Sequence, residues 1–62
     1  MKNISLNIEL SEQEAWDYAQ FLKRVGFSEF RTNAQDDDEA YRMLAVSEKV
    51  RKAINDLGIN PR

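Results

Sequence analysis

The 62-residue sequence contains no cysteine and no histidine. Disulfide bonds, cysteine-ligated zinc and thiol nucleophiles are therefore excluded, and the side chain that most often shuttles protons near neutral pH is missing. The sequence also has no Gly-rich phosphate loop, no nucleophile elbow and no apolar run long enough to cross a bilayer. We therefore expect a protein that is not an enzyme, needs no cofactor or metal, takes no small-molecule substrate and does not enter a membrane.

What is present is a short chain with 42% hydrophobic and 32% charged residues. This composition favours one folded domain over residues 1–62, although a chain of this size buries only about 60% of the surface that its unfolded form exposes. The N-terminus does not have the pattern of a signal peptide, so we expect a cytoplasmic protein. The formal net charge is −2, with nine acids and four bases in residues 1–39 and two acids and five bases in residues 40–62.

Residues 3–10 alternate between apolar and polar side chains. The apolar positions are Ile4, Leu6, Ile8 and Leu10. The polar positions are Asn3, Ser5, Asn7 and Glu9. A period of two predicts a β-strand with one buried face. Because no second strand is visible in the rest of the sequence, we expect this strand to pair with its own copy in a homodimer.

Two long helices are predicted after the strand, over residues 12–25 and 37–57. Ser11 and Glu14 have the spacing of a capping box at the start of the first helix, and Gly26 is placed to end it in a left-handed conformation. Each helix has an apolar stripe that should pack against the other. The first stripe is Ala15, Tyr18, Ala19, Leu22 and Val25, and the second is Ala40, Met43, Leu44, Ser47, Val50, Ile54 and Leu57.

The second helix has start and stop signals of its own. Asp36 is expected to cap it, with Glu39 completing the capping pattern, and Gly58 is expected to end it. Between the helices, residues 27–35 form either a short helical turn capped by Ser28 or an ordered loop. The predicted fold is α+β and mostly helical, with one N-terminal strand followed by two long helices.

Two aromatic residues, Trp16 and Tyr41, lie off the centres of the predicted stripes. Because Trp and Tyr are enriched at binding hot spots, either is a candidate for a partner-binding surface, the alternative being the protein's own core or dimer interface. A second candidate is the acidic run Asp36, Asp37, Asp38 and Glu39. Consecutive carboxylates at a helix start diverge, which suits a cap better than a metal site. We expect a non-enzymatic module that inhibits or regulates a protein partner of unknown identity.

The polar side of the predicted strand favours an alternative function. Asn3, Ser5 and Asn7 are suited to contacts with base edges, and some dimeric repressors insert a ribbon of two paired N-terminal strands into the major groove. The order strand, helix, helix resembles this ribbon-helix-helix class. The net charge of −2 and the isoelectric point near 5.0 disfavour nucleic acid, since phosphate binding needs an excess of cations.

Three runs carry a family resemblance: AQFLKRVGFSEFR over residues 19–31, DEAYRM over residues 38–43 and GINPR over residues 58–62. They resemble short bacterial proteins that are often encoded on phages, plasmids and integrated mobile elements and that have no assigned activity. The resemblance implies a bacterial, cytoplasmic protein that is accessory to a mobile element. It also implies action by binding, either to block a host-defence complex such as CRISPR or restriction machinery or to modulate transcription.

Overall fold

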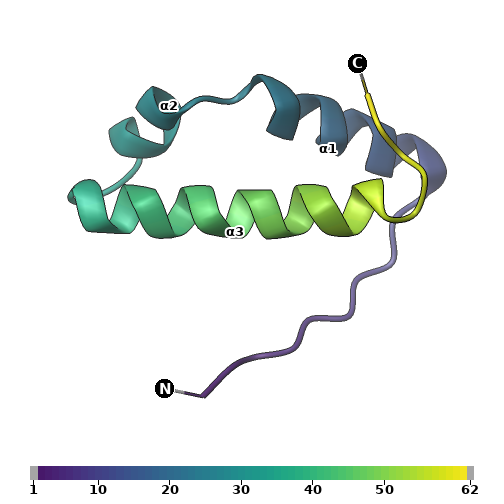
Figure 1. Cartoon of the computed structure of the whole chain (residues 1–62), viewed down its shortest axis with the longest axis horizontal. Helices are drawn as coiled ribbons and strands as arrows, with labels where there is room; N and C mark the ends of the chain where they lie inside the picture. Colours follow the sequence, from purple (N-terminus) through teal and green to yellow (C-terminus); the bar gives the residue numbers. More distant parts are fainter. Residues whose placement is uncertain (1, 62) are drawn as a thin grey trace.

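The computed structural model describes residues 2–61 and contains three helices there, α1 (Glu12–Arg24), α2 (Phe27–Thr32) and α3 (Asp37–Asn55). The two terminal residues of the predicted domain, 1 and 62, lie outside this range. α3 runs along the length of the molecule, and α1 and α2 follow one another along one side of it (Figure 1). α1 and α2 each pack against α3. Within residues 2–61, no helix combines the length and apolar character that a bilayer span requires.

The capping box predicted at the start of α1 is present. The Glu14 amide donates to the Ser11 hydroxyl over 3.1 Å, and the Ser11 amide donates to the Glu14 carboxylate over 2.8 Å. The Ser11 amide, and after it the Ser11 hydroxyl, lower the pKa of Glu14 because both favour the ionised carboxylate. The first helix is therefore started by two residues that are three apart in the sequence.

The junction between α1 and α2 differs from the prediction. Gly26 has φ −114° and ψ 176°, so the expected left-handed stop is wrong. α1 ends instead because Val25 is extended, with φ −70° and ψ 135°. Gly26 is the N-cap of α2, and its amide donates to the Glu29 carboxylate over 3.0 Å. The same glycine therefore begins the next helix directly after the previous one has ended.

Ser28, the predicted cap of the short helix, lies inside α2, so that prediction is wrong. Its hydroxyl donates to the Glu29 carboxylate over 3.1 Å. The amide of Glu29 itself, the Ser28 hydroxyl and the Gly26 amide lower the pKa of Glu29, in that order. Glu29 thus performs the capping that the sequence analysis assigned to a serine.

The start of α3 has the predicted cap with one change. Asp36 accepts the Glu39 amide over 2.8 Å, whereas the Glu39 carboxylate accepts the Gln35 amide over 3.1 Å. In a capping box the Glu39 carboxylate would accept the amide of the N-cap residue, Asp36, but here it accepts the amide of the residue before it. At the other end α3 stops at Asn55, two residues before the predicted end, and Gly58 makes the expected turn just after it, with φ 90°.

The core of the described chain is small. Its buried apolar residues are Ala15, Ala19, Leu22, Ala40 and Ile54. Ala19, Leu22 and Ile54 form one cluster, against which the half-buried Val50 and Ile59 pack. Every side-chain hydrogen bond within residues 2–61 joins residues that are at most six apart. The packing of α1 on α3 is therefore held by apolar contact alone within these residues, whereas α2 and α3 are also joined by the Arg31–Asp37 ion pair.

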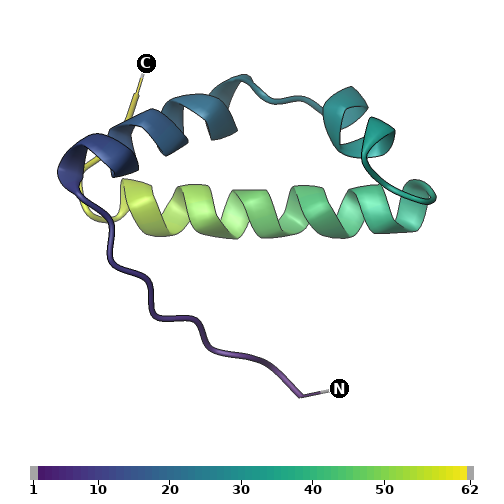
Figure 2. The same cartoon turned by 180° about the vertical axis from the view of Figure 1, so that it is seen from behind.

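The predicted strand is wrong. Residues 2–10, called the arm below, are extended and exposed, and no residue in the described range 2–61 is in a strand. Figures 1 and 2 show the arm leaving the start of α1, passing the end of α3 and continuing away from the helices. Alternation makes one side of an extended segment apolar, but a strand also needs a neighbouring backbone edge, and a helix offers none. The fold of the described residues is helical rather than α+β.

Candidate functional site

Most of the exposed large apolar side chains lie on one side of the molecule. Seven of the ten that are exposed within residues 2–61 line two adjoining hollows beside α3. Together with two neighbours they are called the apolar face here: Leu6, Ile8, Leu10, Tyr18, Phe21, Val46, Val50, Ala53 and Leu57. Leu6 is 80% exposed and Leu57 is 79% exposed, so little within the described chain covers them.

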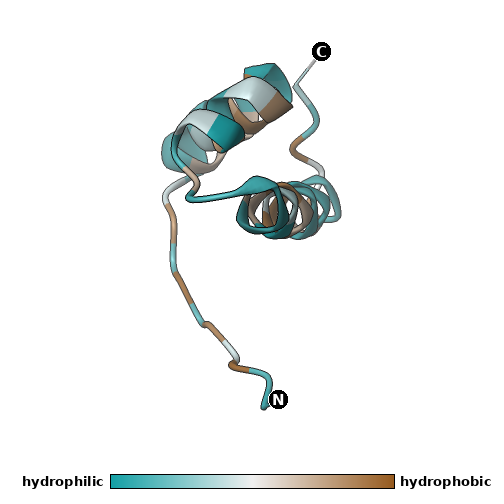
Figure 3. Cartoon of the chain, turned by 90° about the vertical axis from the view of Figure 1, so that its left-hand side faces the viewer, coloured by the Kyte–Doolittle hydropathy of each residue, from teal (hydrophilic) through white to brown (hydrophobic). Residues whose placement is uncertain are grey.

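The apolar face is continuous because its two hollows share Tyr18 and Val50. The larger hollow, of about 650 Å³, opens between the arm, α1 and the C-terminal half of α3. The smaller one follows α3 towards its start. The rings of Tyr18 and Phe21 stack on this face with their centroids 5.8 Å apart. Figure 3 shows the alternating hydropathy of the arm below the helices.

The local sequence explains why this face stays open. α3 has 19 residues, and two shorter helices pack on it, α1 with 13 residues and α2 with six. The buried contacts of α1 are made largely through alanines and one leucine, and such small side chains cover only the middle of the stripe. Tyr18, Val50 and Leu57, which the sequence analysis placed on the packed stripes, are therefore half-buried or exposed at its flank.

Charged groups reach the apolar face only at its edge. Glu14 lines the larger hollow, and Glu39 and Arg42 line the smaller one. The carboxylates of Glu14 and Glu39 already accept backbone amides at the starts of α1 and α3. The chemistry of the face is therefore suited to contact with another apolar protein surface.

The two aromatic residues predicted to bind a partner lie apart from each other and outside the apolar face. Tyr41 is 60% exposed near the start of α3, with its ring centroid 4.8 Å from that of Phe27. Trp16 is half-buried on α1, which packs near Ile54. Tyr41 and Ile54 are separated by about 20 Å along α3. The structure therefore does not combine Trp16 and Tyr41 into one site.

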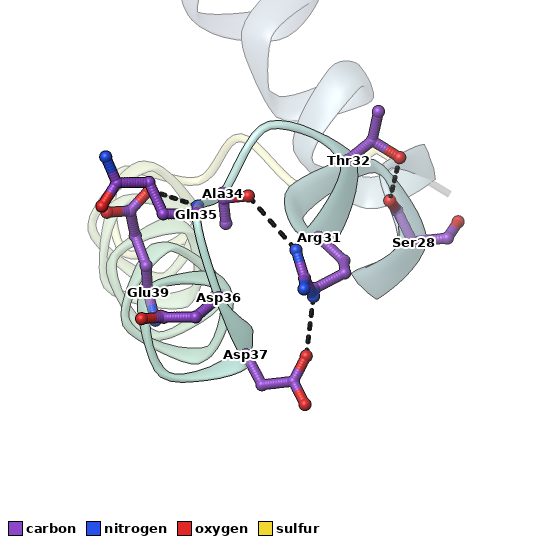
Figure 4. Close-up of polar contacts among 8 residues, drawn as sticks. All are labelled: Ser28, Arg31, Thr32, Ala34, Gln35, Asp36, Asp37 and Glu39. Carbon is purple, nitrogen blue, oxygen red and sulfur yellow. Dashed lines mark hydrogen bonds and ion pairs between the residues drawn. The ribbon is translucent and has the colours of Figure 1, made fainter.

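The acidic run is largely engaged in local contacts (Figure 4). Asp36 and Glu39 hold backbone amides at the start of α3. Asp37 accepts the Arg31 Nε over 2.7 Å, which joins α2 to α3, and Arg31 also donates to the Ala34 carbonyl. The Asp38 side chain makes no hydrogen bond or ion pair with another residue in the range 2–61. No three acidic side chains in that range converge as a metal site would require.

The residues of the DNA-binding alternative lie on the arm. Asn3, Ser5 and Asn7 are exposed and alternate with the apolar side chains of the same segment. In the described structure they belong to an extended arm and not to a strand that could form a two-stranded ribbon. The structural basis of the ribbon-helix-helix resemblance is therefore absent from residues 2–61.

Sequence reasoning missed the apolar face because it counted stripe residues as core. The signal that could have revealed the face is the unequal size of the two predicted apolar stripes. The second stripe has seven members, whereas the stripe on the shorter first helix has only five. Phe21 and Val46 lie one step outside the two stripes on the helical wheel, and the structure places both on the exposed side. A wide stripe opposite a short partner helix indicates a surface that something else must cover.

Over residues 2–61, the fold and the apolar face define a small three-helix protein whose hydrophobic surface is left open by the rest of that range. The whole sequence, residues 1–62, matches the family of unknown function DUF7706, and the chain belongs to this family. No match to a curated protein was found, and none to a solved structure.

Proposed function

We propose that the protein is a non-enzymatic binding module that inhibits or regulates a protein partner through its apolar face. The observation that carries this proposal is the gathering of seven exposed large apolar side chains on one side of a chain with very little core. Monomeric proteins rarely leave a large contiguous apolar patch in water, and such patches mark interaction sites. The proposal moves the partner surface from Trp16, Tyr41 and the acidic run to the arm, α1 and α3.

Covering the apolar face supplies enough free energy for specific binding. Burying one Leu or Val side chain contributes roughly 1.5–3 kcal/mol. The stacked rings of Tyr18 and Phe21 add two aromatic anchors of the kind that dominate binding hot spots. A partner that presents an apolar helix or loop to this face would therefore bind without forming any buried ion pair.

The family resemblance of the sequence provides the biological setting of the proposal. We place the module in the bacterial cytoplasm as an accessory of a phage, plasmid or other mobile element. Its target in that setting is a host protein complex, such as CRISPR or restriction machinery. No observation in the described structure favours the DNA-binding alternative.

A pair of neighbouring substitutions tests the surface. Val46→Glu places a charge on the apolar face, whereas Ala45→Glu places the same charge one residue away on a part of α3 that lines neither hollow. Each immobilised variant is exposed to bacterial lysate, and the retained proteins are quantified by mass spectrometry. We expect a partner that is held by the wild type and Ala45→Glu and reduced at least tenfold by Val46→Glu.

Two further results are decisive. Loss of the partner with Trp16→Ala/Tyr41→Ala but not with Val46→Glu would return the site to the aromatic residues first predicted. Retention of no protein above the level seen with an unrelated helical protein of similar size and charge would contradict a protein partner altogether.

A further inference from the structure

We infer that the free protein is a homodimer in which a second copy covers the apolar face. This inference rests on the proposed function, since it uses the same face and names its occupant in the purified protein. Three observations carry it: the area left exposed, the charge polarity of α3 and the position of the arm.

The exposed area is too large for a closed monomer. The solvent-accessible surface of 5508 Å² exceeds by about 1,400 Å² the roughly 4,100 Å² of a compact 7.2 kDa protein. The radius of gyration of 12.7 Å is likewise larger than the ~10.6 Å of a compact 62-residue domain. A standard interface buries about 800 Å² on each partner. A second copy on the apolar face would thus remove more than half of the excess.

The charges of α3 select the arrangement of the two copies. Its first turn contains Asp37, Asp38 and Glu39, of which Asp37 pairs with Arg31, and its C-terminal third contains Lys49, Arg51 and Lys52, of which Lys52 pairs with Asp56. If two α3 helices pack antiparallel about a two-fold axis, each acidic end faces the basic end of the other copy. Parallel packing would instead place like charges together. The mean position of the two charge groups lies near residue 44, about 2.5 Å along α3 from Val46, which belongs to the apolar face.

The arm gives the second copy a further apolar strip to contact. Leu6 and Ile8 project into the larger hollow together with Val50 and Leu57, yet all but Val50 remain exposed in a single chain. A two-fold interface presents the same patch from both copies, and an apolar patch with few charges is complementary to itself. The two arms and the two α1–α3 hollows would therefore be covered in one event.

The first test is the mass in solution, measured by light scattering on a sizing column at micromolar and submillimolar concentrations. We expect twice the 7.2 kDa chain mass for the wild type and for Ala45→Glu, and the mass of one chain for Val46→Glu. Leu6→Ser/Ile8→Ser provides a second variant that is outside all three helices and therefore leaves their helical circular dichroism intact. It should shift the wild-type dimer towards monomer.

The second test concerns the antiparallel arrangement. Because the chain has no cysteine, single-cysteine variants report on one position each. Under mild oxidation Val46→Cys should form a disulfide between copies, since a disulfide requires Cα atoms within about 7 Å. Ala45→Cys and Asp38→Cys should remain largely unlinked. Efficient linkage of Asp38→Cys to itself, without linkage of Val46→Cys, would overturn the antiparallel packing.

The inference and the proposed function can fail separately. A wild type that remains monomeric at every concentration overturns the homodimer. Slow hydrogen exchange of arm amides in that monomer would show the arm folded back on its own chain. If this monomer still binds a host protein in a manner that Val46→Glu abolishes, the proposed function stands without the dimer. A dimer that no apolar-face variant weakens overturns the inference alone, because the apolar face would then remain free for the protein partner.

Discussion

The two ends of α3 are stabilised in different ways. At its start, α2 and the loop before α3 are connected by short-range polar contacts, including the Arg31–Asp37 pair and the Asp36 cap. Towards its other end, α1 packs on α3 through Ala19, Leu22 and Ile54, and a wide apolar face remains exposed beside this cluster. Polar groups thus find their hydrogen-bond and ion-pair partners among near neighbours in the sequence. The chain has more apolar surface, by contrast, than a chain of this length can bury by itself.

The largest effect is expected in the α1–α3 cluster. Leu22→Ala should cost about 2–5 kcal/mol, because Leu22 is buried in the only cluster that joins the two long helices of the described chain. A core of this size supplies only about 3–5 kcal/mol, so the variant should be largely unfolded. Circular dichroism during urea titration measures this, with the exposed neighbour Lys23→Ala as the control. Equal midpoints for both variants would contradict the assigned core.

Helix capping should have the next largest effect. Ser11→Ala removes the hydroxyl that accepts the Glu14 amide and should cost about 0.5–2 kcal/mol. Ser28→Ala is the matched substitution at the other end of the molecule, where Glu29 rather than the serine caps the helix, and it should change stability by less than about 0.5 kcal/mol. Urea denaturation of both variants measures the contrast. A larger loss with Ser28→Ala would reverse the assignment of the caps.

The Arg31–Asp37 ion pair should contribute less than either cap. Its side chains are 44% and 74% exposed, so solvent screens their attraction and about 0.2–1 kcal/mol is expected. A double-mutant cycle with Arg31→Ala and Asp37→Ala isolates the pair energy, which should decrease as salt is added. A coupling energy that does not change with salt would show that the two residues interact through packing instead.

The smallest effect is a dependence of stability on pH. The Ser11 amide and hydroxyl lower the pKa of Glu14 in the folded chain. The unfolded chain therefore takes up the proton first as the pH falls. The stabilisation is complete above the unfolded pKa of about 4.3 and is lost as the pH falls through the lower folded pKa. Thermal unfolding between neutral and acidic pH should show a smaller loss for Glu14→Gln than for the wild type, and identical losses would contradict this role.

Much of the helical structure could be read from local patterns. The capping box of Ser11 and Glu14, the Asp36 cap and the left-handed Gly58 involve residues at most three apart, and all three are present. Prediction failed where two signals competed. Gly26 is typical of a helix stop, but its amide is used to begin α2, because Glu29 lies three residues further on.

The candidate site was less predictable than the helices. Trp16 and Tyr41 were chosen for their residue types, yet the structure places them apart. Tyr41 contacts Phe27 near the start of α3, whereas Trp16 lies on α1, which packs near Ile54 towards the other end of α3. The acidic run was correctly interpreted as a helix cap at Asp36, and Asp37 pairs with Arg31. Exposure of an apolar stripe depends on how much of it another helix covers, and this cannot be counted from one stripe alone.

The sequence by itself determined where the long helices begin, because caps and turns require only a few neighbouring residues. It also determined that the arm is extended with one apolar side. Only the tertiary structure decided that this arm has no strand partner in the described chain and that α1 covers only part of the stripe on α3. The physical reason is that alternation and helical periodicity specify which side of a segment is apolar, whereas burial requires a second surface of matching length.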